Sequence, residues 1–382
     1  MSETNIKTSS EKSVRGSFHE PKRHIVRRNS ITWKKVLPIR FLAFVIAIVL
    51  CGIVTYLLTG DNPIDIYKTI IDGAVGTERR RWLLLQNTAI LLCISLAVTP
   101  AFMMRFWNIG AEGQALMGGL SAAACMLFLG DALPAPALMA VMVICSIGTG
   151  AIWAMIPAIF KAKWNTNETL FTLMMNYIAT QIVSYFVYCN SVPKGSGQIG
   201  VINASTKAGW FPALGGYTYL LNIIITVVLT IGIFIYLRMS KHGFEISVVG
   251  KSENTANYLG INVKAVIIRT MLLSGAVCGL AGLMLVGGTN HTISTATVGG
   301  RGFTAIMVSW LGSFNPLNMI IYAFLIVFME RGAIEVSTVF GLNDSFSSIL
   351  TGILIFCIIG NNFFLNYSVK KNNHAKKEES AK

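Results

Sequence analysis

The sequence predicts an all-α fold, a polytopic transmembrane helical bundle of about ten spans with both termini in the cytoplasm. Three observations predict it. Of the 382 residues, 53% are hydrophobic and 13% are charged, whereas about 25% of the residues of a soluble domain are charged. The apolar residues form continuous runs close to the ~20 residues that a helix needs to cross a bilayer, without the alternation of a β-barrel. Lys and Arg gather in the two tails.

The predicted spans follow one another along the chain. The region from Phe303 to Met329 is divided by Gly312 and Pro316, which predicts two short spans joined by a tight turn at Leu311–Pro316. Eight further spans are single apolar runs, and together they make ten crossings. These eight cover Phe41–Leu58, Asn87–Met104, Ile109–Gly130, Leu133–Phe160, Glu168–Cys189, Tyr217–Leu237, Ala265–Gly287 and Phe346–Phe364.

The two tails carry most of the net charge. Residues 1–40 hold ten Lys or Arg against three Glu, and residues 370–382 hold five Lys against two Glu. Because Lys and Arg favour cytoplasmic loops, both tails are predicted to lie inside, which requires an even number of spans. The run Arg79–Arg81 then falls outside, against this rule. Topology and attraction to anionic lipid explain the basic tails without nucleic acid.

These features predict three parts of the chain. Residues 1–38 form a basic disordered tail, residues 39–366 a transmembrane domain that includes a polar cytoplasmic loop at 239–264, and residues 367–382 a second basic tail. The protein is therefore expected to be a multi-pass protein of the cytoplasmic membrane.

Enzymatic motifs are missing from the sequence. It has no Gly-x-x-x-x-Gly-Lys-[Ser/Thr], no His-Glu-x-x-His and no Gly-x-Ser-x-Gly. Its seven cysteines stand singly in apolar runs, which predicts neither a disulfide nor a metal site. The chain is not expected to be an enzyme, and any ATP that it uses must be bound by another subunit.

A polar island at Asn108–Gln114 leads into a run of small residues at Gly118–Ala124. Small side chains let helices approach closely, so this span should lie inside the bundle. Glu112 and Gln114 would then sit in or near the membrane, where a carboxylate costs ~2.5 to 3.5 kcal/mol on insertion scales. The Glu112 carboxylate either lines the translocation path or fixes a broken helix there, or it hydrogen-bonds neighbouring backbone at the membrane interface, with Arg105 as a further partner.

A second polar group recurs every fourth residue at Glu168, Thr172, Asn176, Thr180 and Ser184. Steps of four residues advance 400° on a helix, so these side chains form one slowly winding stripe. The stripe could line a hydrophilic path, or its members could make hydrogen bonds between helices. Asn176 is the better functional candidate, because an amide is costly to bury without a partner.

The polar loop predicts a short helix of its own. Ser252 is a suitable N-cap, Glu253 suits the positive end of a helix, and Gly260 ends it. Ala256 and Tyr258 give it an apolar side. So short a helix is marginal in water, and it would be held against a partner protein or against lipid headgroups.

Four motifs in order support a resemblance to a known family. They are Gly250–Lys264 followed by Met271–Gly282, Asn108–Gln114, Asn167–Glu168 with Leu173–Ala179, and Gly302–Ile306 with Leu311–Gly312 and Asn315–Pro316. The chain resembles permease subunits of ATP-binding-cassette (ABC) importers of the nucleoside and simple-sugar kind, within the branched-chain amino acid permease superfamily. The resemblance runs from about Phe41 to Asn361.

The resemblance implies a subunit that translocates nucleosides, driven by ATP hydrolysis elsewhere. It implies cytoplasmic ATPase subunits that bind ATP and Mg, a second permease in a heterodimer, and an extracytoplasmic substrate-binding lipoprotein that docks at the external segment Asn190–Gly216. Substrate would pass Asn108, Glu112, Gln114, Glu168, Thr172 and Asn176. The ATPase would couple through Ser252, Glu253, Ala256, Tyr258, Gly260 and Ile261.

The sequence leaves two alternatives to a nucleoside importer open. Ribose-type permeases carry a Gly-Gly-Ile-Asp-Leu-Ser-type segment near Asn108–Gln114, and its absence here favours nucleosides over ribose or galactose. Hydroxyl-rich sugars would nonetheless use the same polar side chains. An ion-coupled secondary transporter would need several ionisable residues at mid-membrane, and Glu112 is the one serious candidate.

Overall fold

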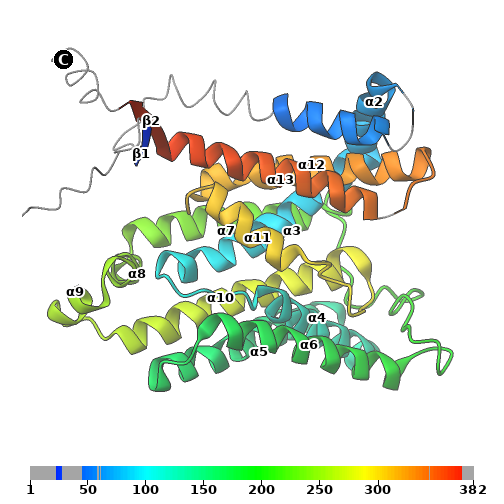
Figure 1. Ribbon diagram of the computed structural model, residues 1–382. Helices are drawn as coiled ribbons and strands as arrows, with labels where there is room; N and C mark the ends of the chain where they lie inside the picture. Colours follow the sequence, from blue (N-terminus) through cyan, green and yellow to red (C-terminus); the bar gives the residue numbers. More distant parts are fainter. Residues whose placement is uncertain (1–22, 28–44, 58–59, 61, 344, 372–382) are drawn as a thin grey trace, which may run out of the picture. The chain divides into compact units, whose positions relative to one another are not determined.

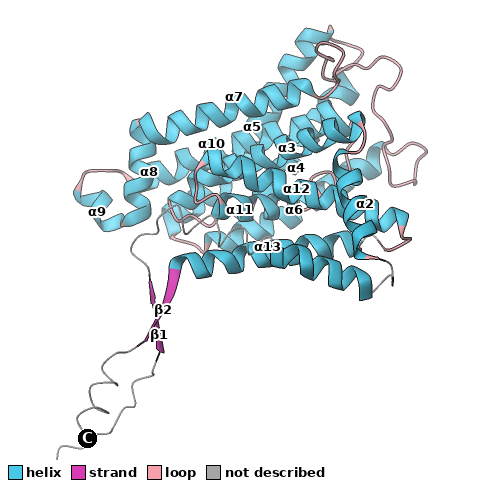
Figure 2. Cartoon of the chain, turned by 90° about the horizontal axis from the view of Figure 1, so that it is seen from above, coloured by secondary structure: helices cyan, strands magenta, loops and turns pink. Residues whose placement is uncertain are grey.

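The computed structural model describes residues 23–27, 45–57, 60, 62–343 and 345–371 (Figure 1). Helices account for almost all of this part, and strand appears only at β1 and β2 (Figure 2). After a helix at Val45–Leu57, the elements are α2 (Pro63–Val75), α3 (Glu78–Met103), α4 (Ala111–Leu129), α5 (Ala135–Trp164), α6 (Glu168–Asn190), α7 (Leu220–Met239), α8 (Lys241–Lys251), α9 (Glu253–Tyr258), α10 (Val263–Leu285), the π-helix η1 (Val286–Asn290), α11 (Arg301–Leu311), α12 (Pro316–Val339) and α13 (Ser345–Asn366).

The chain divides into two compact units. The smaller combines residues 1–46 and 357–382, and in it β1 (Arg23–Arg27) pairs antiparallel with β2 (Tyr367–Lys371). The sequence predicts disorder throughout 1–38, so this pairing is a difference from expectation. Strand pairing between distant parts of a chain leaves no local pattern to detect. The rest of both predicted tails lies outside the described residues.

The larger unit, residues 47–356, is a helical bundle, as predicted. Six of its helices are long and apolar enough to cross a membrane, namely α3, α4, α5, α6, α7 and α10 with η1. The described parts at Val45–Leu57 and Ser348–Cys357 are shorter apolar helices. Every predicted span falls on a helix, while residues 41–44 and 58 of the first predicted span lie outside the described part. The number of crossings stays a prediction.

The divided region differs in length from expectation. The break at Gly312–Asn315 is confirmed, and the Asn315 side chain caps α12 by accepting from the Leu317 N–H at 3.2 Å. The prediction of two short spans ending at Met329 is wrong, because α12 has 24 residues and continues to Val339. Glu330, Arg331 and Glu335 make its second half look like a loop in the sequence.

An ion pair accounts for Arg80, one of the three arginines that depart from the rule on cytoplasmic charge. Arg79–Arg81 lie in the first turn of α3, which starts nine residues earlier than predicted. Arg80 forms a 2.6 Å ion pair with Glu335 of α12 and donates a 2.9 Å hydrogen bond to the Asp72 carbonyl at the end of α2. Arg80 is therefore engaged within the bundle.

The core forms around α10, which packs on α5, α4 and α3 (Figure 1). Gly275 and Gly279 of α10 face α5, and a Cβ at these positions would overlap the carbonyl oxygens of Gly150 and Ser146. These two glycines therefore let α10 and α5 approach closely. The small-residue helix α4 is also packed inside the bundle, as predicted.

Candidate functional site

The helix α4 begins halfway along α10. Asn108, three residues before α4, donates from Nδ2 to the Oγ of Ser274 at 3.2 Å, and Ser274 is the middle residue of α10. Further along, Gly282 of α10 packs against the backbone of Ala115 and Gly119. The segment Arg105–Gly110 therefore enters the bundle in a non-helical form, and α4 covers only the second half of α10.

The helix α11 also begins inside the bundle. Arg301 donates to the Oδ1 of Asn87 at 2.9 Å, and Ser309 hydrogen-bonds Thr99 at 2.8 Å. These partners show that α11 runs beside the second half of α3, in the same direction. Its 11 residues span about 16 Å, roughly half of the ~30 Å hydrocarbon core.

The carboxylate of Glu112 joins the beginnings of α4 and α11. Its Oε1 accepts from the Gly300 N–H at 2.8 Å and its Oε2 from the Gly302 N–H at 2.7 Å. The first N–H groups of a helix have no partner within the helix and carry its positive dipole end. Glu112 itself lies in the first turn of α4. One negative charge is therefore held between the N-terminal ends of α4 and α11, and we call this arrangement the junction.

Glycine makes the junction possible. Gly300 has φ +78°, in the left-handed region, and forms the N-cap of α11. A Cβ on Gly302 would lie 2.5 Å from the backbone nitrogen of Glu112. A larger residue at Gly302 would push α11 away from the carboxylate, whereas one at Gly300 would strain the left-handed backbone.

A buried amide network supports the segment before α4. Asn108 Oδ1 accepts from the Gly110 N–H and from Gln114 Nε2, both at 3.0 Å. Asn176 of α6 accepts from the Gly113 N–H and donates to the Ile109 carbonyl, both at 2.9 Å. Irregular backbone inside a membrane protein needs such partners. The network therefore fixes the shape of the segment on which Glu112 depends.

The predicted path residues are mostly gathered at this place. Thr172 Oγ1 accepts from the Ile109 N–H at 3.2 Å, so it joins the network with Asn108, Gln114 and Asn176. Glu168 differs, because its carboxylate pairs with Lys161 of α5 at 2.9 Å. The polar atoms of these side chains are engaged within the protein, and their contact with substrate stays a prediction.

A second candidate site lies at the α8–α9 connection, shown at the end of α7 in Figure 2. Ser252 caps α9 by accepting from the Thr255 N–H at 3.2 Å, and Gly260 with φ +73° follows its end. Ala256 is fully buried, whereas Tyr258 is 93% exposed. The predicted short helix is confirmed. The prediction that Tyr258 shares an apolar side with Ala256 is wrong, because the Tyr258 ring points outward.

The comparison with known proteins identifies the family. Residues 82–359 match the family described as "Branched-chain amino acid transport system / permease component". The chain belongs to this permease family. It is a multi-pass protein of the cytoplasmic membrane and a permease subunit of an ABC transporter, and the permease itself is not an enzyme.

Three curated relatives resemble this permease over most of their length. The nucleoside ABC transporter permease of Lactococcus lactis is 28% identical over 93% of this chain and 98% of its own. The guanosine permease of Bacillus subtilis is 29% identical over 81% of this chain and 90% of its own. The glucose permease of Haloferax volcanii is 26% identical over 85% of this chain and 88% of its own.

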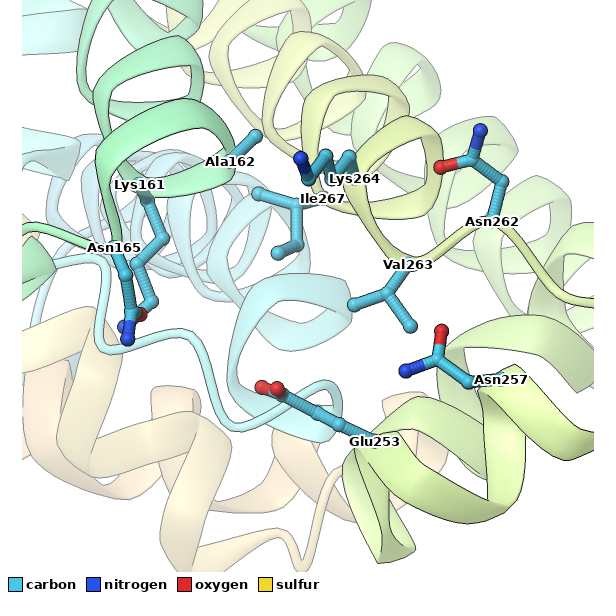
Figure 3. Close-up of a pocket in the computed structure, with 9 residues that line it drawn as sticks. All are labelled: Lys161, Ala162, Asn165, Glu253, Asn257, Asn262, Val263, Lys264 and Ile267. Carbon is cyan, nitrogen blue, oxygen red and sulfur yellow. The ribbon is translucent and has the colours of Figure 1, made fainter.

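The permease has a polar cavity beside α9. It measures about 420 Å³ and lies between α9, the end of α5 and the start of α10. Figure 3 shows Glu253 of α9 and Lys161 of α5 facing the same opening, with Lys264 above it. A shift of α9 toward α5 would close this space.

Two functional features escaped sequence reasoning. The helix α8 was not predicted, although Ile246, Val249 and Gly250 have the spacing of one buried face. His242 of α8 contacts Tyr236 of α7 and lies 3.4 Å from the Thr270 hydroxyl of α10. Burial lowers the pKa of His242, which the nearby Glu245 carboxylate opposes. Backbone partners were predicted for Glu112, with Arg105 as a further one, but the actual donors, 188 and 190 residues away, were missed.

Proposed function

We propose that this permease carries nucleosides inward across the cytoplasmic membrane as part of an ABC importer. The observation that supports it most is the likeness to a nucleoside permease over 93% of this chain and 98% of that protein. Simple sugars are the second candidate, because the glucose permease relative matches 85% of the chain. No cofactor is assigned to this chain, and ATP with Mg would be bound by partner ATPase subunits.

The proposed assembly places the ATPase subunits at α9. Ser252, Glu253 and Gly260 define the ends of this helix. Ala256 is buried and its carbonyl accepts from the Ile261 N–H, and Tyr258 offers the contact. A second, different permease chain would complete the membrane part. A substrate-binding lipoprotein would dock on the external segment between α6 and α7, which the 2.8 Å bond from the Ile202 N–H to the His291 carbonyl ties to the loop after η1.

The proposed topology has ten crossings with both termini inside. It puts α8 and α9 in the cytoplasm and the connection between α6 and α7 outside. It also puts the N-terminal end of α3 outside, where Arg80 is paired with Glu335. In this arrangement the junction at Glu112 lies near the middle of the membrane.

The proposed mechanism moves α9 and α10 together. ATP-driven closure of the ATPases would shift α9, and only four residues separate the end of α9 from the start of α10. Because Gly275 and Gly279 pack directly on the α5 backbone, α10 would carry α5 with it. The shift would reach Asn108 through Ser274, and so would alter the segment before α4 where the proposed path residues lie.

Uptake competition tests the proposed substrate. Uptake of radiolabelled guanosine is measured in cells with and without this permease, with unlabelled nucleosides, ribose, galactose or glucose as competitors. The proposal expects uptake that depends on the permease and that nucleosides alone suppress. Suppression by a sugar would move the substrate to the second candidate, and uptake independent of the permease would overturn both.

A further inference from the structure

One face of α11 is apolar and aromatic yet uncovered in this chain. Phe303, Met307 and Trp310 lie on this face at spacings of four and three residues, and Trp107 adjoins Trp310. These four side chains, which we call the aromatic stripe, are each 38 to 48% exposed. The opposite face of α11 is buried through Gly302, Ala305, Val308 and Ser309.

The two tryptophans are held in a defined pair. Their ring centroids are 5.4 Å apart with the planes inclined by 39°. Phe102, itself buried, meets Trp107 edge-on at 5.8 Å and Trp310 edge-on at 6.3 Å. The Trp107 carbonyl accepts from the Ile109 N–H at 3.1 Å, which fixes the backbone beside it. Both rings are thus oriented by the protein while their outer surfaces remain accessible.

The aromatic stripe starts at the junction. Phe303 follows Gly302, whose N–H binds Glu112, and Trp310 lies two turns further along α11. Trp310 and Trp107 contact Phe102 near the end of α3, and the neighbouring Met103 packs against Gly250 of α8. The stripe therefore leads from the middle of the bundle to the end that carries α8.

A membrane belt explains this arrangement less well. Belt tryptophans gather at one level of the membrane–water interface, as Trp107 and Trp310 do. Phe303 and Met307, however, continue the stripe over about 10 Å along α11, which a belt does not explain. An aromatic heterocycle fits it better, because flat rings stack on tryptophan faces in offset or tilted pairs. Two of the relatives described above are named for nucleosides or guanosine, which contain such a ring.

We propose that Trp107 and Trp310 form a stacking site for the aromatic ring of the substrate, on the path from the junction to the cytoplasmic end. The inference rests on the proposed nucleoside function and deepens it. The site would recognise the nucleobase.

Binding without the lipoprotein tests this site directly. The complex of both permeases and the ATPases is purified in lipid nanodiscs, and the Kd of radiolabelled guanosine is measured for the unaltered permease and for W107L, W310L and W310F. Loss of stacking in either leucine variant should raise the Kd roughly ten-fold, whereas W310F should change it by less than about three-fold. W164L is the matched control, because Trp164 is exposed on α5 away from the stripe.

The outcomes separate this proposal from its alternatives. An unchanged Kd in W107L and W310L would overturn it, as would a wild-type complex that transports guanosine in cells but binds none. If W310L instead lost the second permease during purification, the stripe would be a subunit interface and the stacking site would be wrong. If the unaltered permease took up no nucleoside in cells, the proposed function itself would fail.

Discussion

The most informative perturbation is Glu112→Gln. The carboxylate accepts two hydrogen bonds, at 2.8 and 2.7 Å, from the N–H groups of Gly300 and Gly302. The glutamine amide has one accepting oxygen, so its NH₂ group must face the other N–H. Hydrogen bonds to charged groups contribute about 1.5 to 3 kcal/mol, and a buried unsatisfied N–H costs ~1 to 3 kcal/mol. We therefore expect a loss of roughly 2 to 4 kcal/mol in folding free energy, since the two terms overlap.

The assay for this variant is the apparent Tm of the purified permease complex, measured together with guanosine uptake. Glu78→Gln is the matched control, because Glu78 is also in a helix first turn but is exposed. That change removes only a dipole interaction of ~0.3 to 1 kcal/mol. Glu112→Gln should lower the Tm by several degrees and reduce uptake, and the control should do neither. Equal Tm and uptake in the two variants would refute the role assigned to the junction.

Three further predictions follow from other contacts. Gly279→Leu should prevent α10 from packing on α5 near Ser146 and abolish the yield of folded permease, measured by size-exclusion chromatography. Gly148→Leu is the control and should be tolerated, because a Cβ at Gly148 meets no atom within 4 Å. A normal yield of Gly279→Leu would contradict this. Tyr258→Ala should leave the Tm unchanged but lower substrate-stimulated ATP hydrolysis several-fold, because a hot-spot aromatic side chain contributes about 1 to 2 kcal/mol at an interface; unchanged stimulation would remove Tyr258 from the ATPase contact. Burial lowers the pKa of His242, so the folded protein favours the neutral imidazole. The Tm should therefore be highest above the ordinary pKa near 6.5 and fall as the pH drops below it. A pH profile of Tm that is identical in His242→Gln would contradict this.

Local signals predicted the α9 helix well. Its N-cap, its acidic first turn and its terminal glycine all lie within nine residues, from Ser252 to Gly260. Such signals act through backbone groups close in sequence, so they can be recognised without knowledge of the rest of the fold. Its buried side was predicted only in part, since Ala256 is covered while Tyr258, predicted on the same apolar side, is exposed.

The junction could not be predicted in the same way. Glu112 bonds to backbone 188 and 190 residues later, and no local pattern specifies that partner. The sequence offered one general indication of a site here. Glycine-interrupted apolar segments mark broken helices at binding sites in other transporters, and glycines precede both α4 and α11. The polar stripe predicted on α6 is buried only in its first part, since Thr172 and Asn176 are buried while Ser184 is exposed.

Reconstitution tests the central claim most directly. The permease is placed in proteoliposomes with its second permease, its ATPase subunits and its binding lipoprotein, and the accumulation of radiolabelled guanosine and of glucose is followed. The account predicts guanosine accumulation that requires both ATP and this chain. Accumulation of glucose instead, or of guanosine driven by a proton or sodium gradient without ATP, would contradict it.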